Sequence, residues 1–333
     1  MYFKKFMAVV LTIAVCLSSF PAYAVNTADS TSDTQIENQF DFVPEPIVDL
    51  EYSQTLEEYN AEGSLSNGIT WKSEYGMLSI YGNGDMPDFE IGTAPWYDGR
   101  EEVSFIYLSD GITSVGDYAF YDMANVTGIY MPDTVTEIGE GAFMQCSSMP
   151  DIKLSKNLVT IKQAAFKGCN SFETVSIPKN TKNIEEEAFS SCLNLKDFAF
   201  PEGSEYFVSH SGYGLFTKDM SALITYPGGL TDSEYVMPNS VKEIYPNAFE
   251  NCYYLTNIVF PEGLEIIGEN AFTNCSGIEV INIPASVTTI AQNAFLYGCD
   301  GLKEINVDEN NANYSSDMGV LYNKDKTIII QFP

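Results

Sequence analysis

Basic residues are scarce in this chain of 333 residues. Lys and Arg number 16 against 46 Asp and Glu, so the formal net charge at pH 7 is -30. A charge of this sign repels the phosphate backbone of nucleic acids and the surface of anionic membranes. We therefore expect no nucleic-acid partner.

Histidine is almost absent, and this limits the catalytic devices open to the chain. His210 is the single histidine, so a Ser-His-Asp or Cys-His nucleophile would depend on it alone. The sequence has no phosphate-binding loop, no zinc-binding His-Glu-x-x-His and no calcium-loop pattern. The glutamates at 185–187 offer carboxylates for acid–base chemistry, but in so acidic a chain they are more simply a solvated face. We predict that the protein is not an enzyme and that it has no catalytic residues, no cofactor and no metal site.

Long apolar runs are missing apart from one at the N-terminus. Two lysines precede the apolar stretch 6–17, which is too short to cross a bilayer, and residues 22–24 read Ala-Tyr-Ala, a small-x-small cleavage pattern. Residues 1–24 are therefore predicted to be a secretory signal peptide. A lipoprotein signal ending at Cys16 is the alternative, but the preceding Val15 is bulkier than the residue expected there.

Apolar residues are also few in the segment 25–60, which contains no Lys or Arg and many Asp, Glu, Ser, Thr and Asn residues. Such a composition cannot bury enough surface to offset the loss of chain entropy on folding. We predict an acidic disordered linker, and an acidic binding tail is the alternative.

What the sequence has in abundance is a repeat. Seven Ala-Phe dipeptides recur at intervals of 23 residues, apart from one interval of 60, and their phenylalanines stand at positions 120, 143, 166, 189, 249, 272 and 295. One unit reads Val126-x-x-Ile129-x-Met131-Pro132-x-x-Val135-x-x-Ile138-x-x-x-Ala142-Phe143-x-x-Cys146. The Ile-x-Met core, Ile-x-Ile in other units, predicts a short strand with its outer two side chains inward and its middle one outward. The Pro that follows lacks an N–H donor and ends the strand.

A single unit cannot bury its apolar edge, so the units must stack on one another. The repeat therefore predicts an α/β solenoid in which each coil of 23 residues contributes one short strand. Neighbouring strands would lie about 4.8 Å apart and form one continuous parallel sheet. The Ala of each Ala-Phe pair is small where coils approach closely, and the Phe fills the interior.

These residues resemble the BspA-type leucine-rich repeats of bacterial and protist surface proteins, over roughly residues 102–333. The pattern Ile-Pro-x-x-Val-x-x-Ile-Gly-x-x-Ala-Phe-x-x-Cys recurs, with departures that include Ser109 and Ser155 for the Pro, Thr181 for the Val, and Lys162 and Glu185 for the Gly. The segment 76–96 resembles the one that commonly precedes such an array. Its alternation predicts an N-terminal β-hairpin cap within residues 61–101.

The interval of 60 residues contains an insertion near 206–230, and the chain ends on a second copy of it near 312–333. Gly214 to Asp219 matches Val320 to Asp325 at a constant offset of 106 residues. Each copy is predicted to be a β-hairpin that turns at its Lys-Asp pair. Because only the first copy continues into another coil, we expect a truncated array, with an anchor or a further domain beyond it.

Six cysteines follow the Ala-Phe pairs in nearly constant register, namely Cys146, Cys169, Cys192, Cys252, Cys275 and Cys299. Side chains in such a column point the same way rather than toward one another, although the predicted spacing alone does not exclude disulfides. We expect free, buried thiols. A linear column also lacks the tetrahedral convergence that zinc requires.

The outward positions of the stacked strands, with the residues just before each strand core, are predicted to form a concave face for partners. The candidates for partner binding are Tyr107, Tyr130, Asp151, Lys153, Asp197, Glu234, Asn257, Asn282 and Asn306. Tyr107 beside Tyr130 is the strongest aromatic platform among them, although strands favour tyrosine in any case.

These features predict a non-catalytic binding module that is secreted or attached to the cell surface through a region beyond this sequence. The resemblance implies adhesion to an extracellular protein of a host matrix or of a neighbouring cell. Two alternatives stay open, a spacer for a C-terminal enzyme or anchor domain and a glycan-binding module. We expect a monomer with no transmembrane segment.

Overall fold

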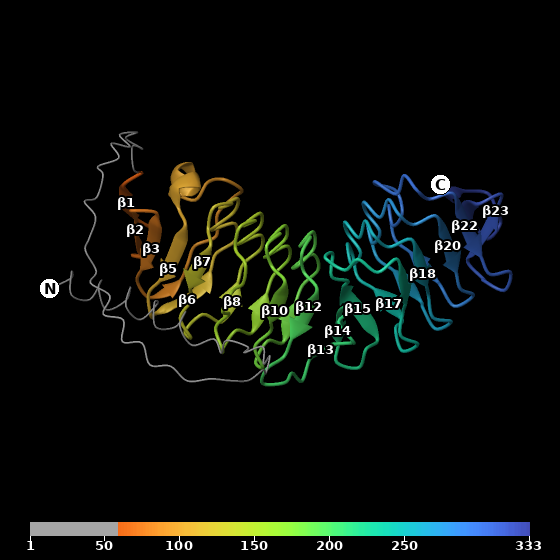
Figure 1. Ribbon diagram of the computed structural model, residues 1–333, viewed down its shortest axis with the longest axis horizontal. Helices are drawn as coiled ribbons and strands as arrows, with labels where there is room; N and C mark the ends of the chain where they lie inside the picture. The colour runs from red at the N-terminus through yellow and green to blue at the C-terminus, as the bar shows by residue number, and fades with distance from the viewer. Residues whose placement is uncertain (1–58) are drawn as a thin grey trace, which may run out of the picture. The chain divides into compact units, whose positions relative to one another are not determined.

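The computed structural model describes residues 59–333, which belong to one compact unit that starts at Thr55. The predicted signal peptide and all but the last two residues of the predicted acidic linker lie outside the described residues. The described residues form stacked coils of parallel strands, which confirms the predicted solenoid (Figure 1).

Most coils contribute a short strand to a parallel ladder, here called the first ladder. Its strands are β5 (Phe105–Leu108), β7 (Gly128–Tyr130), β10 (Thr174–Ser176), β12 (Asp197–Ala199), β16 (Glu234–Val236), β18 (Asn257–Val259), β20 (Val280–Ile283) and β22 (Glu304–Val307). Equivalent positions of neighbouring repeats pair directly, as Ile106 does with Ile129 and Val175 with Phe198. The register that the repeat predicts is therefore the register of the sheet.

Each coil also contributes a second, mostly two-residue strand that was not predicted. These strands form a second ladder, made of β4 (Gly84–Asp85), β6 (Ile112–Val115), β8 (Glu137–Ile138), β9 (Thr160–Ile161), β11 (Asn183–Ile184) and, after the insertion, β15 (Ala222–Thr225), β17 (Glu243–Ile244), β19 (Ile266–Ile267) and β21 (Thr289–Ile290). Of these strands, β6 to β11 and β17 to β21 carry the Ile or Val that lies three positions after the Val of the repeat, so that Ile138 pairs with Ile161. Most coils thus contribute strands to two parallel ladders, where the sequence predicted one.

The predicted single sheet is not continuous, because the first ladder is interrupted between coils. Residues 151–155 form no strand. In the preceding coil the amide of Thr127 donates to Ser104 O at 2.8 Å. The equivalent residue one repeat later is Pro150, which has no N–H to donate, so this rung of the ladder is missing.

The α component of the predicted α/β solenoid is nearly absent. The one helix among residues 59–333 is the short 3-10 helix η1 (Tyr97–Glu102). The Ala-Phe segments are turns that bond from coil to coil, as when Phe143 N donates to Ala165 O at 2.8 Å. Positive φ angles of 54° at Gly141 and 66° at Gln145 flank the phenylalanine. A helix would direct these amides along its own axis instead.

The phenylalanines of the Ala-Phe pairs stack along the interior. Two stacks of buried rings result, one through Phe120, Phe143, Phe166 and Phe189 and one through Phe249, Phe272 and Phe295. Neighbouring ring centroids lie 4.8 to 5.4 Å apart. The stacks belong to two separate hydrophobic cores.

The insertion and its copy at the end of the chain are both three-stranded antiparallel sheets, one strand more than the predicted hairpin. The first consists of β13 (Phe207–Ser209), β14 (Leu215–Thr217) and β15, and the second of β23 (Tyr314–Asp317), β24 (Val320–Asn323) and β25 (Ile329–Gln331). The last turn of each contains the Lys-Asp pair, as predicted. β15 then pairs in parallel with β17, which joins the insertion to the next coil.

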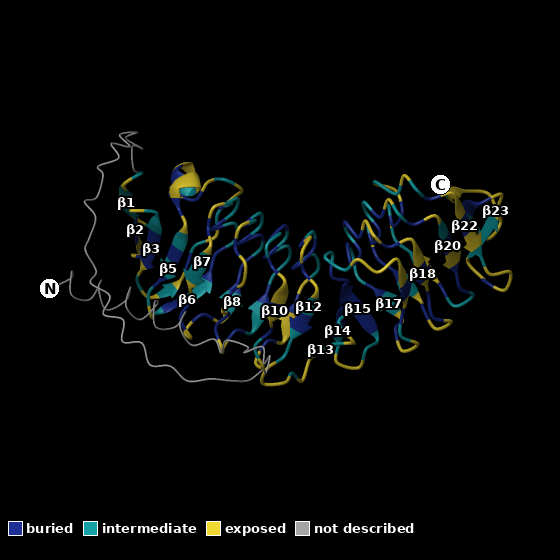
Figure 2. Ribbon diagram, viewed as in Figure 1, coloured by how far each residue is buried: buried dark blue, intermediate teal, exposed yellow. Residues whose placement is uncertain are grey.

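The first of these sheets separates the two cores. Leu215 and Ile224 belong to the core of the preceding coils, whereas Phe216 and Leu223 belong to the core of the following coils. Successive side chains of a strand point to opposite faces, so β15 is buried along its whole length (Figure 2). We call residues 59–205 the first block and residues 228–311 the second block.

The N-terminal strands close the first block. β1 (Ala61–Ser64), β2 (Thr70–Glu74) and β3 (Met77–Tyr81) form an antiparallel sheet, and β3 pairs in parallel with β5. The ring of Trp96 lies 5.9 Å from that of Phe120, and its Nε1 donates to Ala119 O at 2.7 Å. These contacts cover both the apolar edge and a backbone carbonyl of the first coil, as the end of a solenoid requires.

The six repeat cysteines are free thiols, five of them buried and Cys299 half-buried. Five thiols donate to the carbonyl of a repeat phenylalanine, for example Cys169 Sγ to Phe143 O at 3.2 Å. Burial raises the pKa of Cys146 and Cys192 to about 12. A thiol that stays protonated is a poor nucleophile, so the column is structural.

We expect the folded protein to resist a thiol-specific reagent at mildly alkaline pH and all six repeat thiols to react once it is unfolded in guanidinium. Cys299 should react first, because it alone of the six is half-buried. The time course of thiol titration, with and without denaturant, measures this. Stoichiometric disulfides in non-reducing mass spectrometry would contradict it.

Candidate functional site

The outward side chains of the first-ladder strands form a surface that is here called the first-ladder face. Parallel pairing sets Tyr107 beside Tyr130 and Asn282 beside Asn306. Because their backbones are fixed by the sheet and by the buried residues on either side, these side chains project from a rigid frame. The face carries most of the residues predicted to bind a partner.

Three tyrosines form a continuous aromatic row at the start of this face. The ring centroids of Tyr107 and Tyr130 lie 5.3 Å apart at an interplanar angle of 15°, and Tyr81 lies 6.0 Å from Tyr107. Tyr81 and Tyr130 are each 45% exposed. Burial, followed by Asp110 and Asp133, raises the pKa of Tyr130, so its hydroxyl remains a hydrogen-bond donor at neutral pH.

Tyr81 was not predicted as a candidate. It lies on β3, and the N-terminal sheet was expected to cap the array rather than to extend its binding face. Ser79 pairs with Tyr107, and residues two apart on a strand share a face, which brings Tyr81 to the same side. The sequence could have predicted this position of Tyr81. Leu78 and Ile80 alternate as inward residues, so residues 79 and 81 both belong to the outward face of the strand.

The middle of the face differs in part from the prediction. Asp151 and Lys153 are exposed but lie in the interrupted part of the ladder. Asp197 is half-buried, and its Oδ1 accepts hydrogen bonds from Ser209 Oγ at 2.7 Å and from Phe198 N at 2.8 Å. Its carboxylate therefore ties β12 to the insertion and is less free for a partner than expected.

The remaining candidates lie beyond the insertion, on the second block. Glu234 and Asn257 are exposed and face one another across β16 and β18. Asn306 Nδ2 donates to Asn282 Oδ1 at 3.3 Å. The candidate residues thus form two groups that β13 to β15 separate, rather than one uninterrupted row.

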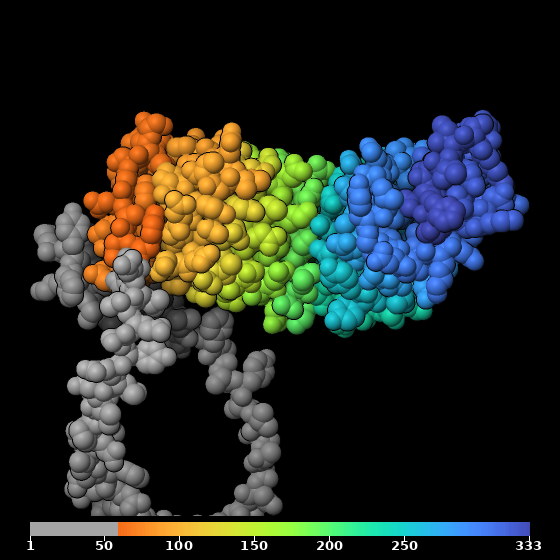
Figure 3. All heavy atoms as spheres, turned by 90° about the horizontal axis from the view of Figure 1, so that it is seen from above, coloured from red at the N-terminus to blue at the C-terminus, as the bar shows by residue number. Residues whose placement is uncertain are grey.

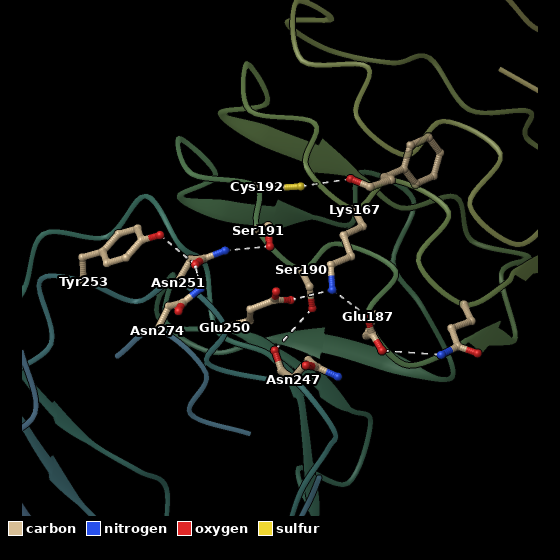
Figure 4. A network of polar contacts seen from close by, with 12 residues as sticks. Lys167, Glu187, Ser190, Ser191, Cys192, Asn247, Glu250, Asn251, Tyr253 and Asn274 are labelled. Atoms are coloured by element: carbon tan, nitrogen blue, oxygen red, sulfur yellow. Dashed lines mark hydrogen bonds and ion pairs between the residues drawn. The ribbon is translucent and has the colours of Figure 1, made fainter. Parts of the chain in front are cut away.

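A largely buried ion triad, whose three residues are all half-buried, joins the two blocks on the Ala-Phe side of the coils (Figure 4). Lys167 Nζ lies 2.7 Å from Glu187 Oε2 and 2.9 Å from Glu250 Oε2. The three side chains are only 19, 19 and 11% exposed, respectively. Lys167 and Glu187 belong to the first block and Glu250 to the second.

Hydrogen bonds between uncharged groups beside the triad also join the first block to the second, at what is here called the junction. Ser190 Oγ donates to Asn247 O at 3.3 Å, and Asn251 Nδ2 donates to Ser191 Oγ at 2.7 Å (Figure 4). Residues that contact one another here are 57 and 60 positions apart in the sequence. The junction is therefore held by polar side chains where the stack of phenylalanines is interrupted.

The other candidates for chemistry are not brought together. His210 is exposed, and its ring meets that of Phe216 edge-on at 6.4 Å. The hydroxyl of Ser209 donates to Asp197 rather than to the histidine, so Ser209 and His210 do not form a Ser-His pair. Within residues 59–333 no group of three or more His, Cys, Asp or Glu side chains is placed to hold a metal ion.

Among residues 59–333 no helix has the length and apolar character needed to span a bilayer. No curated protein sequence matches the chain. The BspA type leucine-rich repeat region matches residues 91–217 and 230–330 in six copies.

Several solved structures are similar to this chain. A leucine-rich repeat protein from Eubacterium ventriosum is 27% identical with a TM-score of 0.64, over 75% of this chain and 72% of its own. The pneumococcal vaccine antigen PcpA is 20% identical with a TM-score of 0.54, over 76% of this chain and 83% of its own, and shows the shared fold. The family match covers more than half of the sequence, and the chain therefore belongs to the BspA-type leucine-rich repeat family.

Proposed function

We propose that the protein is a non-catalytic binding module, secreted or held at the cell surface, that presents the first-ladder face to an extracellular protein. The observation that carries the proposal is the row of Tyr81, Tyr107 and Tyr130 on paired strands. The predicted signal peptide and the membership of a bacterial-type repeat family support the location.

Tyrosines on a rigid frame are suited to recognising a protein. Each offers a large contact area with few rotatable bonds, and a frame that is already ordered loses little entropy on binding. The phenol groups add hydrogen-bond donors at the edge of the row. The carboxylates of Asp110 and Asp133 beside them favour a partner with a basic or neutral surface.

A protein partner is favoured over a glycan by the orientation of the rings. Tyr107 and Tyr130 stack on one another at 15°, so each already uses one ring face within the row. A sugar stacks on an open ring face, whereas a protein can contact the ring edges and the hydroxyl groups.

The experiment that tests the proposal uses residues 25–333 to capture partners from extracellular matrix and mucus, and then measures the affinity for each. Changing Tyr107 and Tyr130 together to Ser should weaken binding by about 2 kcal/mol, roughly thirtyfold. Both side chains point away from the core, so the fold should persist in circular dichroism.

Val236→Ser with Val259→Ser is the matched control, because these residues are 71 and 47% exposed on the second block of the same face. The control should bind with nearly unchanged affinity. If deleting residues 25–58 abolishes binding while the tyrosine pair is neutral, the acidic segment is the binding site instead. Failure to retain any partner would favour the spacer.

A further inference from the structure

The tyrosine row of the first-ladder face has a counterpart elsewhere in the same chain, where a cation is already bound. The row lies on β3, β5 and β7, which pair side by side at the start of the array (Figure 1), in the orange to yellow part of Figure 3. The counterpart is the pair of Tyr97 and Tyr121, whose ring centroids lie 6.2 Å apart at an interplanar angle of 17°. Tyr107 and Tyr130 stack at 15°, so the two pairs share a near-parallel arrangement.

An arginine completes the counterpart. The guanidinium Cζ of Arg100 lies over the ring of Tyr97, 4.2 Å from its centroid. The Nε of Arg100 lies 3.0 Å from Asp122 Oδ2, and the hydroxyl of Tyr97 donates to the same oxygen at 3.5 Å. A tyrosine ring and a carboxylate beside its hydroxyl therefore bind the guanidinium together.

The exposed row has the same two kinds of group. Burial raises the pKa of Tyr130, and Asp110 raises it further through its charge and through a hydrogen bond with the Tyr130 hydroxyl. A carboxylate therefore lies at the hydroxyl of a stacked tyrosine in both places. Tyr107 is the one ring that stacks on Tyr130 within residues 59–333, and Tyr130 is 45% exposed. Part of its ring is thus open to a partner.

The charge of Asp110 is not balanced by a basic residue of the described chain. The other acid near the row, Asp133, is paired, because its Oδ2 lies 2.6 Å from Lys156 Nζ. Lys156 and, more weakly, Lys153 lower the pKa of Asp133. Asp110 is exposed and has no ion pair within residues 59–333. A carboxylate without a counterion beside an exposed ring favours a cation from outside the chain.

The chain has no second arginine to place there. Arg100 is the single arginine of the sequence, and all its other basic residues are lysines. A lysine ammonium is compact and strongly hydrated, whereas a guanidinium is planar, stacks on aromatic rings and offers several N–H donors. The group that this chain places on its own stacked tyrosine pair is a guanidinium. The same groups in the exposed row therefore suit a guanidinium of another molecule.

We propose that Tyr130 and Asp110 form a binding site for an arginine side chain of the protein partner, a refinement that rests on the proposed function. The guanidinium stacks on the ring of Tyr130 and donates to the carboxylate of Asp110. Tyr107 supports the Tyr130 ring by stacking on it. The partner is thus a protein with an exposed arginine, which a chain with a net charge of -30 attracts.

Three short peptides test the site, namely acetyl-Gly-Gly-X-Gly-Gly-amide with arginine, lysine or citrulline at X. Their affinities for the full chain are measured by NMR titration. The arginine peptide should bind about fivefold more tightly than the lysine peptide, because both carry the same charge but the guanidinium stacks better on a ring. The citrulline peptide keeps the planar shape without the charge and should bind more weakly than either.

Asp110→Asn and Tyr130→Leu should each abolish the preference for arginine over lysine. Glu262→Gln is the matched control, because Glu262 is exposed on the second block and its replacement removes one negative charge, as Asp110→Asn does. The control should keep the preference. All three positions lie at the surface, and circular dichroism checks that the variants fold.

Equal affinity for the arginine and lysine peptides, or no detectable binding of either, would overturn the proposal. A preference that survives both Asp110→Asn and Tyr130→Leu would also overturn it, since the arginine would then bind elsewhere. Failure of the proposed function looks different, because a captured partner would keep its affinity when Tyr107 and Tyr130 are both changed to Ser. A partner that loses affinity in that variant while the two peptides bind equally removes the arginine site alone.

Discussion

Replacing Phe143 by Ala is expected to lower the free energy of unfolding by about 3–5 kcal/mol, because a large ring would leave a cavity that neighbouring coils cannot fill. Phe143 is fully buried, and the rings of Phe120 and Phe166 lie 5.3 Å away on either side. Backbone hydrogen bonds hold these coils at a fixed spacing, so the stack cannot close over the gap. Urea unfolding followed by circular dichroism measures the loss.

The matched control is Phe332→Ala, the same substitution at a ring that is 71% exposed. It should change stability by no more than about 0.5 kcal/mol. In a repeat array each coil contacts only its neighbours, so hydrogen exchange should accelerate in the first block more than in the second. Equal urea midpoints for the two variants would contradict the assigned role of the phenylalanine stack.

Replacing Lys167 by Ala is expected to cost about 3 kcal/mol, because it leaves two poorly solvated carboxylates without their shared cation. Glu187 and Glu250 are 19 and 11% exposed, and they come from different blocks. Their repulsion would act across the junction, so the two blocks should unfold at more widely separated urea concentrations. Hydrogen exchange resolved by block would detect this.

Lys196→Ala is the control for this change, because Lys196 forms an ordinary surface pair with Glu173 in which the side chains are 57 and 72% exposed. Its loss should change stability by less than about 0.5 kcal/mol. Equal effects of the two lysine substitutions would mean that the triad does not stabilise the junction.

The triad also implies a dependence on pH at the alkaline end. Burial lowers the pKa of Lys167, but Glu187 and Glu250 outweigh it, so the pKa is raised above 10.5. The folded state then binds this proton more tightly than the unfolded state. The contribution is fully present below pH 10.5 and is lost as the pH rises through the higher folded value. The stability difference between wild type and Lys167→Ala should shrink in that range.

The junction matters for the proposed binding face. The first-ladder face has its tyrosine row on the first block and its asparagines on the second, with β13 to β15 between them. A partner that contacts both groups depends on the blocks being held together. We therefore expect Lys167→Ala to weaken such a partner even though Lys167 lies on the opposite, Ala-Phe side of the coils.

The sequence by itself determined the parts of this protein that recur at one repeat. An interval of 23 residues places identical positions of neighbouring coils side by side, so one unit is enough to assign the rest. Phe143 in the core, Cys169 in a buried column and Tyr107 beside Tyr130 all follow from that spacing. The sequence also predicted the turns at the two Lys-Asp pairs, because the residues of a turn are neighbours in the sequence.

Only the tertiary structure decided the contacts between residues whose separation in the sequence is not a repeat interval. The hydrogen bond from Ser190 Oγ to Asn247 O joins residues 57 positions apart, and the hydroxyl of Ser209 donates to Asp197, 12 residues away. No period in the sequence brings such pairs together. These contacts depend on how the insertion folds between the two cores. They also depend on which backbone groups are already hydrogen-bonded within the second ladder.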